Sequence, residues 1–258
     1  MPFSPRLFAF DLDDTLAPSK SPLDPTMSEL LGQLLDHAEI CIISGGQFGQ
    51  FQSQVIDTLP DFSAAKLARL HLMPTCGTQY YRFEGGWNQI YAENLSEAEK
   101  KHALEVTEQV AKKLGYWESE TWGPILEDRG SQITFSALGQ AAPVVSKMAW
   151  DVDGLKKESL RREVQKLLPT LEVRSGGSTS IDITRRGIDK AYGMRRLAEL
   201  TSIDLREMLF IGDRLDPSGN DYPVKALGVP THAVTGWEDT VRFLQQRPEL
   251  AQCAPFGQ

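Results

Sequence analysis

The sequence has few cysteines and no long hydrophobic run. Its three cysteines, Cys41, Cys76 and Cys253, are far apart and odd in number, and they lack the spacing of metal ligands. This argues against a disulfide framework and favours a reducing compartment. No segment approaches the length of a transmembrane helix, and the N-terminus has no cationic start followed by a long apolar stretch. We therefore expect a cytoplasmic protein.

The chain is also short of positive charge, with 27 lysines and arginines against 35 aspartates and glutamates and a formal net charge of −8. A nucleic-acid-binding surface needs clustered lysine and arginine, so the composition argues against that class of function. A phosphorylated substrate stays compatible with this charge, because a bound cation and a few local bases can reverse the field inside a cleft. The length of 258 residues fits one large domain or a core with an inserted domain.

What the sequence does contain is an apolar run that ends abruptly in acids. Leu7–Phe10 has the length of a strand, and Asp11, Asp13 and Asp14 follow it. Acids at the end of a buried strand are costly unless they are paired or bind a cation. Asp11 and Asp13 lie two apart, so a local strand geometry would point both the same way, which suits Mg²⁺. The alternative interpretation is a strand followed by an acidic turn.

Polar residues follow apolar runs elsewhere in the chain as well. A Ser-Gly-Gly sequence at 44–46 follows the run 39–43, and a glycine-rich turn leaves backbone amides open to a phosphate. A third apolar run ends at Asp213, and Lys190 stands where a helix begins. Each feature alone is read as a turn or a solvated charge. Their combination at strand ends and a helix start favours a site for phosphate chemistry.

The order of predicted elements changes along the chain. Strand and helix patterns alternate in the first part and again towards the C-terminus, which implies parallel strands in a doubly wound sheet. From about Gly85 helices and strands are segregated, with a strand at 131–136 and a hairpin at 171–184. This indicates an α+β unit inserted into an α/β core. Two Ser/Thr-x-x-Glu patterns, Thr26–Glu29 and Ser96–Glu99, predict capping boxes at helix starts.

The segment Asp11-Leu12-Asp13-Asp14-Thr15, with Ser44, Lys190 and Gly212-Asp213, resembles the four motifs of the haloacid dehalogenase (HAD) superfamily of phosphotransferases. The first motif usually reads Asp-x-Asp-Gly-Thr, and Asp14 replaces its glycine here. The resemblance is nearest to subclass IIB, which holds the Cof-type sugar phosphatases and the eukaryotic-type phosphomannomutases. It implies an α/β fold with a doubly wound parallel-sheet (Rossmann-like) core and an inserted α+β cap domain. The segments are expected at 1–85 (core, first part), 86–186 (cap) and 187–258 (core, second part).

The resemblance also implies roles for the motif residues. Asp11 would attack phosphorus, because a carboxylate is a competent nucleophile once cations drain charge from the phosphate. Asp13 would protonate the leaving oxygen and then activate water. Lys190 would offset negative charge, and Asp221 and Asn220 would support it or position water, unless they only cap their loop. The expected phosphate-binding set is Thr15, Ser44, Gly45, Gly46 and Lys190, and the expected Mg²⁺ set is Asp11, the main-chain carbonyl of Asp13, and Asp213.

The cap would select the substrate, and the candidates come from similarity to the phosphomannomutases. Four positions fall on substrate-binding arginines of that family, of which one is retained, two become lysine and one becomes neutral. Lysine lacks the planar fork that grips phosphate, so the hold on a second phosphate is weaker. Alternatively, Arg129 is a surface cation paired with Asp128 or Glu127, and the 180–182 segment is a solvent-facing polar edge. The substrate-binding candidates are Lys20, Arg129, Gln140, Lys147, Ser180 and Asp182.

The function expected from this resemblance is Mg²⁺-dependent phosphoryl transfer on hexose phosphates through an aspartyl-phosphate, as a sugar phosphatase. The alternative is a phosphomannomutase that interconverts mannose 6-phosphate and mannose 1-phosphate. A remote alternative is a catalytically silent regulator that binds sugar phosphate. The expected partner is a phosphorylated sugar, with no nucleic acid and no membrane, and a homodimer through the cap is an option.

Overall fold

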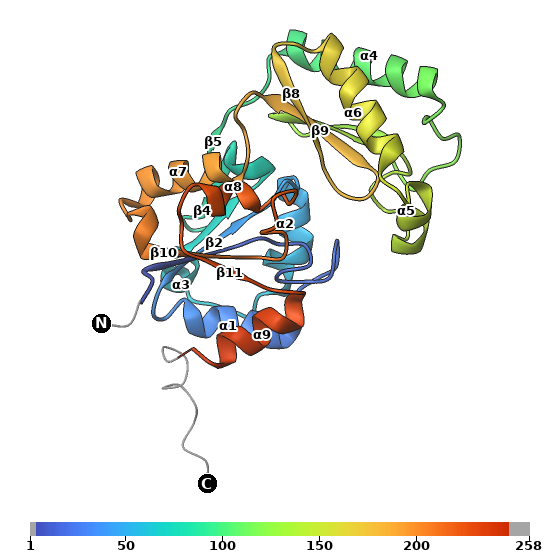
Figure 1. Ribbon diagram of the computed structural model, residues 1–258. Coiled ribbons are helices and arrows are strands. Elements are labelled where there is room, and N and C mark those ends of the chain that lie inside the picture. Colours follow the sequence, from blue (N-terminus) through green and yellow to red (C-terminus); the bar gives the residue numbers. More distant parts are fainter. Residues whose placement is uncertain (1–3, 248–258) are drawn as a thin grey trace. The chain divides into compact units, whose positions relative to one another are not determined.

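The computed structural model describes residues 4–247, which form two compact units (Figure 1). The first unit takes in the chain up to Tyr91 and again from Asp189, and the second unit is Ala92–Ile188. Each unit has a hydrophobic core of its own. The prediction for Cys253 falls outside the described residues.

The first unit is built on a seven-stranded sheet in the order β11-β10-β1-β2-β3-β4-β5. Its strands are β1 (Leu7–Phe10), β2 (Glu39–Ile43), β3 (Leu70–Met73), β4 (Gln79–Phe83), β5 (Trp87–Ala92), β10 (Met208–Gly212) and β11 (Thr231–Ala233). β2 and β10 flank β1 and run parallel to it, with Phe10 opposite Ile42 and Ile211. The chain winds outward from β1 in both directions, which confirms the doubly wound α/β fold expected from the sequence.

Helices cover both faces of this sheet. They are α1 (Pro25–Leu34), α2 (Phe48–Gln54), α3 (Ala64–Leu67), α7 (Lys190–Thr201), α8 (Tyr222–Ala226) and α9 (Trp237–Gln245), with short 3₁₀ turns η1 (Ile56–Thr58), η2 (Thr75–Gly77) and η3 (Leu205–Glu207). α1 and α9 lie side by side on one face (Figure 1). Successive residues of β1 point to opposite faces. Phe8 and Phe10 therefore join the core that contains α1, α2 and α9, whereas Leu7 and Ala9 join the core that contains α7 and α8.

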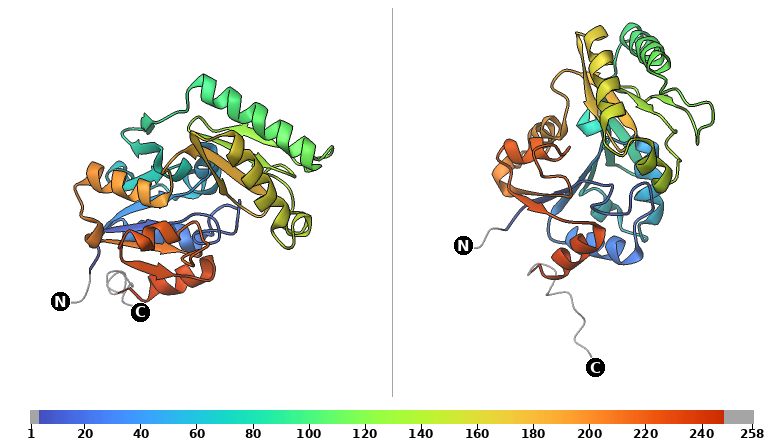
Figure 2. Two further views of the ribbon diagram at one scale, coloured as in Figure 1. Left: turned by 45° about the horizontal axis from the view of Figure 1, so that its top comes forward. Right: turned by 45° about the vertical axis from the view of Figure 1, so that its right-hand side comes forward.

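The second unit combines a four-stranded antiparallel sheet, in the order β6-β7-β9-β8, with two long helices on one face (Figure 2). Its elements are α4 (Glu97–Leu114), β6 (Leu126–Asp128), β7 (Gln132–Ser136), α5 (Val144–Trp150), α6 (Leu155–Leu167), β8 (Leu171–Ser175) and β9 (Ser180–Arg185). Phe135 and Ile183 of the sheet share a hydrophobic cluster with Val106 of α4 and Val164 of α6. Alternate strand positions hold polar side chains instead, and these include Ser180 and Asp182 of β9, two of the residues predicted to bind substrate.

The first boundary between the two units lies later than the sequence patterns indicated. β5 is the edge strand of the first sheet, next to β4, so the second unit begins at Ala92 rather than after residue 85. The glycine that marked the expected boundary is the tip of the β4–β5 hairpin. Gly85 adopts a φ of +73°, a left-handed conformation that favours glycine in tight turns. The second unit likewise ends at Ile188 rather than at residue 186.

The first helix starts differently from its predicted capping box. Asp24 is the N-cap of α1, with its side chain accepting a hydrogen bond from the Thr26 amide at 2.8 Å. Pro25 occupies the first helical position, where its fixed φ and missing N–H are favourable. The second predicted box is present, because Ser96 and Glu99 cap α4 reciprocally. The Thr26 prediction was wrong because a better start lies two residues earlier.

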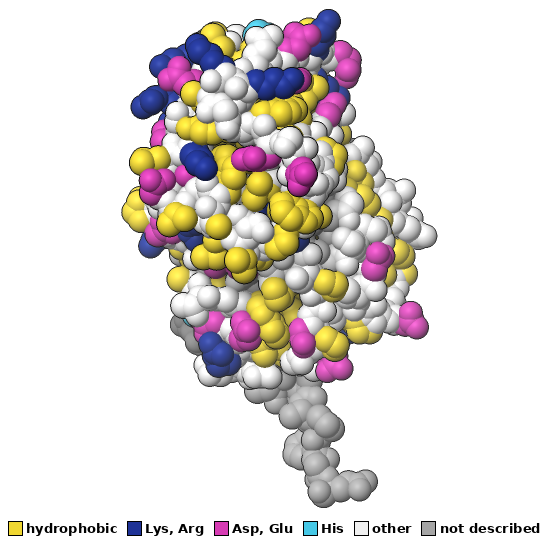
Figure 3. Space-filling model, turned by 90° about the vertical axis from the view of Figure 1, so that its right-hand side faces the viewer, with side chains coloured by type: hydrophobic (Ala, Val, Ile, Leu, Met, Phe, Trp, Pro, Cys, Tyr) yellow, Lys and Arg dark blue, Asp and Glu magenta, His cyan; other side chains and the backbone are white. Residues whose placement is uncertain are grey.

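Several large hydrophobic side chains of the second unit are exposed. Val144, Val145 and Met148 of α5 are 60%, 79% and 65% exposed, and Val152 after it is 87% exposed. Hydrophobic side chains also gather on the face of the molecule shown in Figure 3. The homodimer through the cap stays a prediction. Within residues 4–247, no helix is both long and apolar enough to cross a membrane.

Candidate active site

Three neighbouring strands of the first unit are each followed by a predicted site residue. Asp11 follows β1, Ser44 follows β2, and Asp213 follows β10. The parallel register sets Phe10 level with Ile42 and Ile211, so the three strand ends reach the same edge of the sheet. In doubly wound folds, ligands bind at this carboxyl edge, where the winding direction reverses. The fold therefore brings together motifs that are far apart in the sequence.

The carboxylates at this edge form a compact cluster. Asp11, Asp213 and Asp221 each place an oxygen within 4.8 Å of the others. Asp11 is 4% exposed and Asp221 is fully buried. Gly212 makes room for this approach, because a Cβ at that position would overlap the Asp221 carboxylate. Asp221 was not among the predicted metal ligands and was expected only to support the site, but its carboxylate lies within the cluster. Asn220 lies exposed on the same loop.

Lys190 enters this cluster from the N-terminus of α7. Its ammonium lies 2.6 Å from Asp11 Oδ1 and 2.5 Å from Asp221 Oδ1, and its side chain is 1% exposed. The absence of a side chain at Gly193 lets helix α7 lie close to the backbone of Cys76, because a Cβ at this position would clash with the Cys76 carbonyl. Burial by itself lowers the pKa of the Lys190 ammonium, but the two carboxylates raise it well above its usual range. Lys190 is therefore charged and bridges two acids.

One ammonium does not balance three carboxylates. Burial is the main cause that raises the pKa of Asp213, and repulsion by Asp221 adds to it. Burial also raises the pKa of Asp11 to about 8, although the charge of Lys190 acts in the opposite direction. Uncompensated buried charge of this kind is costly unless a cation joins it. The donors are all carboxylate oxygens, which suits Mg²⁺. Asp11, Asp213 and Asp221 would hold the ion, which supplies the positive charge that keeps the Asp11 carboxylate ionised and offsets phosphate charge.

The side chain of Asp13 lies outside this cluster. Its Oδ2 accepts from Lys20 Nζ at 2.8 Å and from Gln50 Nε2 at 2.9 Å, and its Oδ1 accepts from the Lys20 amide at 2.8 Å. Burial alone would raise the pKa of Asp13, but the charge and hydrogen bonds of Lys20 hold it below the ordinary value. The role of the Asp13 carboxyl in proton transfer and the contact of its main-chain carbonyl with the ion both stay predictions. Lys20, expected to reach the substrate, is instead bonded to Asp13.

The departure from the usual first motif has a structural explanation. Asp14 adopts a φ of +60°, the left-handed region in which glycine is most at ease. Aspartate tolerates this region better than most residues because its short side chain bonds locally. The Asp14 carboxylate accepts a hydrogen bond from the Ser19 amide at 3.1 Å. Asp14 therefore adopts a conformation that glycine favours at this position.

The predicted phosphate-binding residues lie beside the cluster. Thr15 is buried, and its Oγ1 accepts from the Asp213 amide at 3.1 Å. Ser44 Oγ accepts from the Gly46 amide at 3.1 Å. Any contact of the Gly46 amide with a phosphate would have to replace that bond. Ser44 and Gly45 keep their place at the turn that leads from β2 into α2.

The cap candidates are tied to partners within the second unit. Arg129 is 9% exposed, and its Nη2 lies 2.6 Å from Glu127 Oε2, so it is a buried cation paired with Glu127 rather than a surface one. Lys147 Nζ donates to the Gln140 carbonyl at 2.7 Å.

The two candidates on β9 are hydrogen-bonded to residues of the neighbouring strand β7. Ser180 Oγ lies 3.1 Å from Ser136 Oγ. Asp182 Oδ1 accepts from Gln132 Nε2 at 2.8 Å and from Thr134 Oγ1 at 2.7 Å.

Four functional candidates were missed from the sequence. Gln132 and Thr134 orient Asp182, and a signal for them existed, since both lie on the β7 face that the strand alternation assigns to Asp182. The other two, Gln50 and Gln54, lie one helical turn apart on α2 and face Asp13. A spacing of four residues places two side chains on the same face of a helix, but it does not predict which residue they contact.

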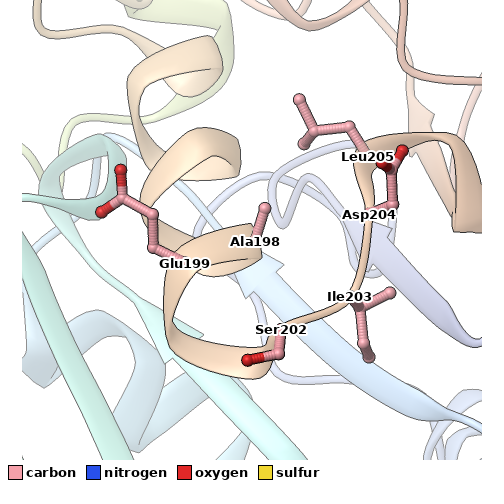
Figure 4. Close-up of a pocket in the computed structure, with 6 residues that line it drawn as sticks. All are labelled: Ala198, Glu199, Ser202, Ile203, Asp204 and Leu205. Atoms are coloured by element: carbon pink, nitrogen blue, oxygen red, sulfur yellow. The ribbon is translucent and has the colours of Figure 1, made fainter.

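A separate surface hollow of about 460 Å³ lies at the C-terminal end of α7 (Figure 4). Glu199 and Asp204 stand on opposite sides of it. It contains none of the motif residues, so it is not the site of the chemistry. The residues that line it are Ala198, Glu199, Ser202, Ile203, Asp204 and Leu205.

Comparison with known proteins agrees with this geometry. The model of the haloacid dehalogenase-like hydrolase family matches residues 135–223, a span that includes Lys190, Asp213 and Asp221. Phosphomannomutase 1 of Mus musculus is 24% identical over 259 residues, which cover 95% of this chain and 94% of that protein. These matches support the resemblance of the chain to the haloacid dehalogenase superfamily. The family match supports an enzyme of the HAD-like hydrolase class, and the similarity to phosphomannomutases agrees with subclass IIB.

Solved structures share the fold. IMP-bound IMP-nucleotidase of Plasmodium falciparum superimposes with a TM-score of 0.68 at 16% identity, covering 96% of this chain and 68% of that one. A trehalose-6-phosphate phosphatase related protein gives a TM-score of 0.55 at 16% identity, covering 93% and 95%. At these identities the likeness concerns the fold alone.

Mg²⁺ is expected to stabilise the folded protein and to be required for activity. An ion that binds only the folded state at 100 times its Kd adds about 2.7 kcal/mol, so Tm should rise by several degrees in thermal unfolding. Asp213→Asn should abolish most of this rise, and EDTA should abolish turnover. Asp216→Asn is the matched control, because Asp216 lies on the same loop but is exposed and paired with Arg214. An undiminished rise in Asp213→Asn would contradict the assigned ion site.

Proposed function

We propose that this protein is a Mg²⁺-dependent phosphatase that hydrolyses hexose phosphates through an aspartyl-phosphate on Asp11. The observation that carries the proposal is the placement of Asp11 against Lys190, within a buried carboxylate cluster, while Asp13 stands apart and is hydrogen-bonded. Two acids of one motif are thus given different surroundings, which is how one site separates a nucleophile from an acid–base residue. A silent binding protein has no need of this division.

The proposed reaction has two steps. In the first, an Asp11 oxygen bonds to phosphorus and the bond between phosphorus and the sugar oxygen breaks, while Asp13, which must enter this step protonated, gives its proton to that oxygen. In the second, water attacks phosphorus, its proton passes to Asp13, and the bond to Asp11 breaks. Lys190 is held beside Asp11 throughout and offsets negative charge on the transferred group.

The cap supports hydrolysis over mutase chemistry. A mutase must retain an intermediate with phosphate at both ends while the intermediate reorients, so it needs cations that are available for the distal phosphate. Here Arg129 is already paired with Glu127, and the Lys147 ammonium bonds to the Gln140 carbonyl. Lys20 is bonded to Asp13. These pairings weaken the hold on a second phosphate and favour release of the product.

Phosphomannomutase activity is the second candidate. The observation that favours it is the similarity to phosphomannomutases over almost the whole chain. The two functions share the catalytic residues proposed here and differ in the fate of the aspartyl-phosphate. Within either function we propose a cytoplasmic location and keep the cap homodimer as a proposal.

Product analysis separates the two functions. We expect wild-type protein, given mannose 6-phosphate or glucose 1-phosphate with Mg²⁺, to release inorganic phosphate faster than it interconverts the 1- and 6-phosphates, as measured by ³¹P NMR. The measurement is repeated with a hexose 1,6-bisphosphate present. Interconversion with negligible phosphate release would establish the mutase instead.

The variant Gln140→Arg should shift this partition. A charged hydrogen bond to the distal phosphate is worth roughly 1.5–3 kcal/mol, so the ratio of interconversion to hydrolysis should rise by about 10-fold or more. Gln109→Arg is the matched control, because it adds the same charge to an exposed position of α4 in the same unit. An equal shift in both variants would assign the effect to overall charge and not to position 140.

A further inference from the structure

Helix α2 presents two glutamines to the carboxylate of Asp13. Gln50 Nε2 lies 2.9 Å from Asp13 Oδ2, and Gln54 Nε2 lies 3.4 Å from Asp13 Oδ1. The two glutamines are four residues apart, so they share one face of the helix. Gln54 is 2% exposed and is itself fixed by a 2.7 Å hydrogen bond to the Ser21 carbonyl. Both oxygens of Asp13 are thus in contact with this helix.

Gln50 also connects Asp13 to Lys20. Its Oε1 accepts from Lys20 Nζ at 2.6 Å, while its Nε2 donates to Asp13 Oδ2. Because the amide oxygen is engaged by an ammonium, the amide nitrogen is the end that faces the carboxylate. A Cβ at Gly46 would overlap Gln50 Oε1, so the glycine turn before α2 leaves the space that this side chain occupies. The contacts fix both the position and the orientation of the Gln50 amide.

We propose that Gln50 is a positioning residue that, with Gln54, holds the Asp13 carboxyl in the orientation required for proton transfer to and from the substrate. The proposal rests on the proposed function, since it assumes that Asp13 is the acid–base residue of a phosphoryl transfer. A carboxyl attached to a flexible turn can rotate away from the leaving oxygen, and misplacement by about 1 Å can cost about 10²-fold in rate. Gln50 prevents this rotation without touching the phosphorus, the nucleophile or the ion.

The dependence of the rate on the leaving group tests this role. A good leaving group, such as p-nitrophenol, departs with little help from an acid, whereas an alkyl or sugar alcohol needs the proton. In Gln50→Leu we expect kcat/KM to fall about 10-fold or more for alkyl phosphates and by less than about 2-fold for p-nitrophenyl phosphate. A plot of log kcat/KM against leaving-group pKa, over a series of aryl and alkyl phosphates, should therefore become steeper.

The same helix offers a matched control. Gln52 lies between the two glutamines in sequence, and its side chain bonds instead to Asp57. Gln52→Leu should leave the slope of that plot unchanged. Gln50→Glu is a second variant of nearly the same shape. It places a carboxylate against Asp13 and should steepen the slope at least as much as Gln50→Leu.

Two results would overturn the proposal. An equal loss of kcat/KM for all leaving groups would show a role in folding or binding only, and an unchanged slope in both Gln50 variants would show no role. The slope is measured on simple phosphomonoesters and does not depend on the proposed sugar substrate. A wild-type enzyme that does not hydrolyse hexose phosphates would therefore refute the proposed substrate and leave the test of Gln50 valid.

A second measurement needs no turnover. In a double-mutant cycle of Gln50→Leu with Asp13→Asn, measured by chemical unfolding, the two effects should be non-additive because the side chains are in contact. Additive effects would contradict the contact, and with it the proposal, even in a protein that hydrolysed nothing.

Discussion

Asp11→Asn should abolish turnover and leave the protein folded. An amide cannot attack phosphorus, so the loss should be of the order of 10⁶-fold, as when a protease loses its nucleophile. Stability should be kept or raised, because burial raises the pKa of Asp11 to about 8 and a neutral amide removes one charge from an overcharged cluster. Lys190 keeps Asp221 as its partner. Phosphate release from p-nitrophenyl phosphate and thermal unfolding measure the two effects.

A matched control for this variant is Asp36→Asn, an exposed aspartate in the same unit that pairs with Lys66. It should retain full activity. If Asp11→Asn, prepared free of wild-type protein, hydrolyses phosphomonoesters at a substantial fraction of the wild-type rate, then Asp11 is not the nucleophile. A large fall in Tm would instead show that the carboxylate is needed for folding.

The core of the site could be predicted because its residues follow apolar strands. A run such as Leu7–Phe10 indicates a buried parallel strand, and the carboxyl ends of such strands meet at one edge of the sheet. The sequence therefore predicts that Asp11, Ser44 and Asp213 lie together. The register of β1 with β2 and β10 then brings the strand ends level.

What the sequence could not supply was the partner of each polar side chain. The prediction that Lys20 binds substrate rests on similarity to the phosphomannomutases, yet a φ of +60° turns its backbone so that both its amide and its ammonium reach Asp13. Gln50 went unnoticed because glutamine is common on solvated helix faces. A charge pattern indicates which residues are available for chemistry, but only the packing of α2 against the Asp13 turn decides which of them meet.

The same distinction explains the misplaced boundary. The boundary predicted after residue 85 rests on the change from alternating to segregated strands and helices near Gly85. In the structure Gly85 is the tip of a hairpin whose second strand, β5, still belongs to the first sheet. A glycine marks a local turn, and the pairing of the strand that follows, which is a long-range property, determines the unit to which that strand belongs.

Lys190→Met should damage both stability and activity. The substitution leaves the carboxylates of Asp11 and Asp221 buried without their shared ammonium, which stood 2.6 and 2.5 Å from them. Removing one partner from a buried ion pair costs about 3–5 kcal/mol, because the remaining charge is uncompensated. We expect a fall of that size in the free energy of unfolding without Mg²⁺, measured by urea denaturation. Turnover should fall about 10²–10³-fold, the scale on which loss of a charge-stabilising group acts.

Lys66→Met provides the comparison that separates burial from charge. Lys66 also forms a 2.9 Å ion pair, with Asp36, but the side chains of that pair are 22% and 50% exposed. Solvent-exposed pairs contribute about 0–1 kcal/mol, so this variant should lose little stability and no activity.

Adding Mg²⁺ should restore part of the stability of Lys190→Met, because the ion binds only the folded protein and replaces some of the lost positive charge. Equal small losses in the two lysine variants would mean that the buried cluster does not depend on Lys190 for its charge balance. A stability loss in Lys190→Met that Mg²⁺ cannot reduce would mean that the ion binds elsewhere.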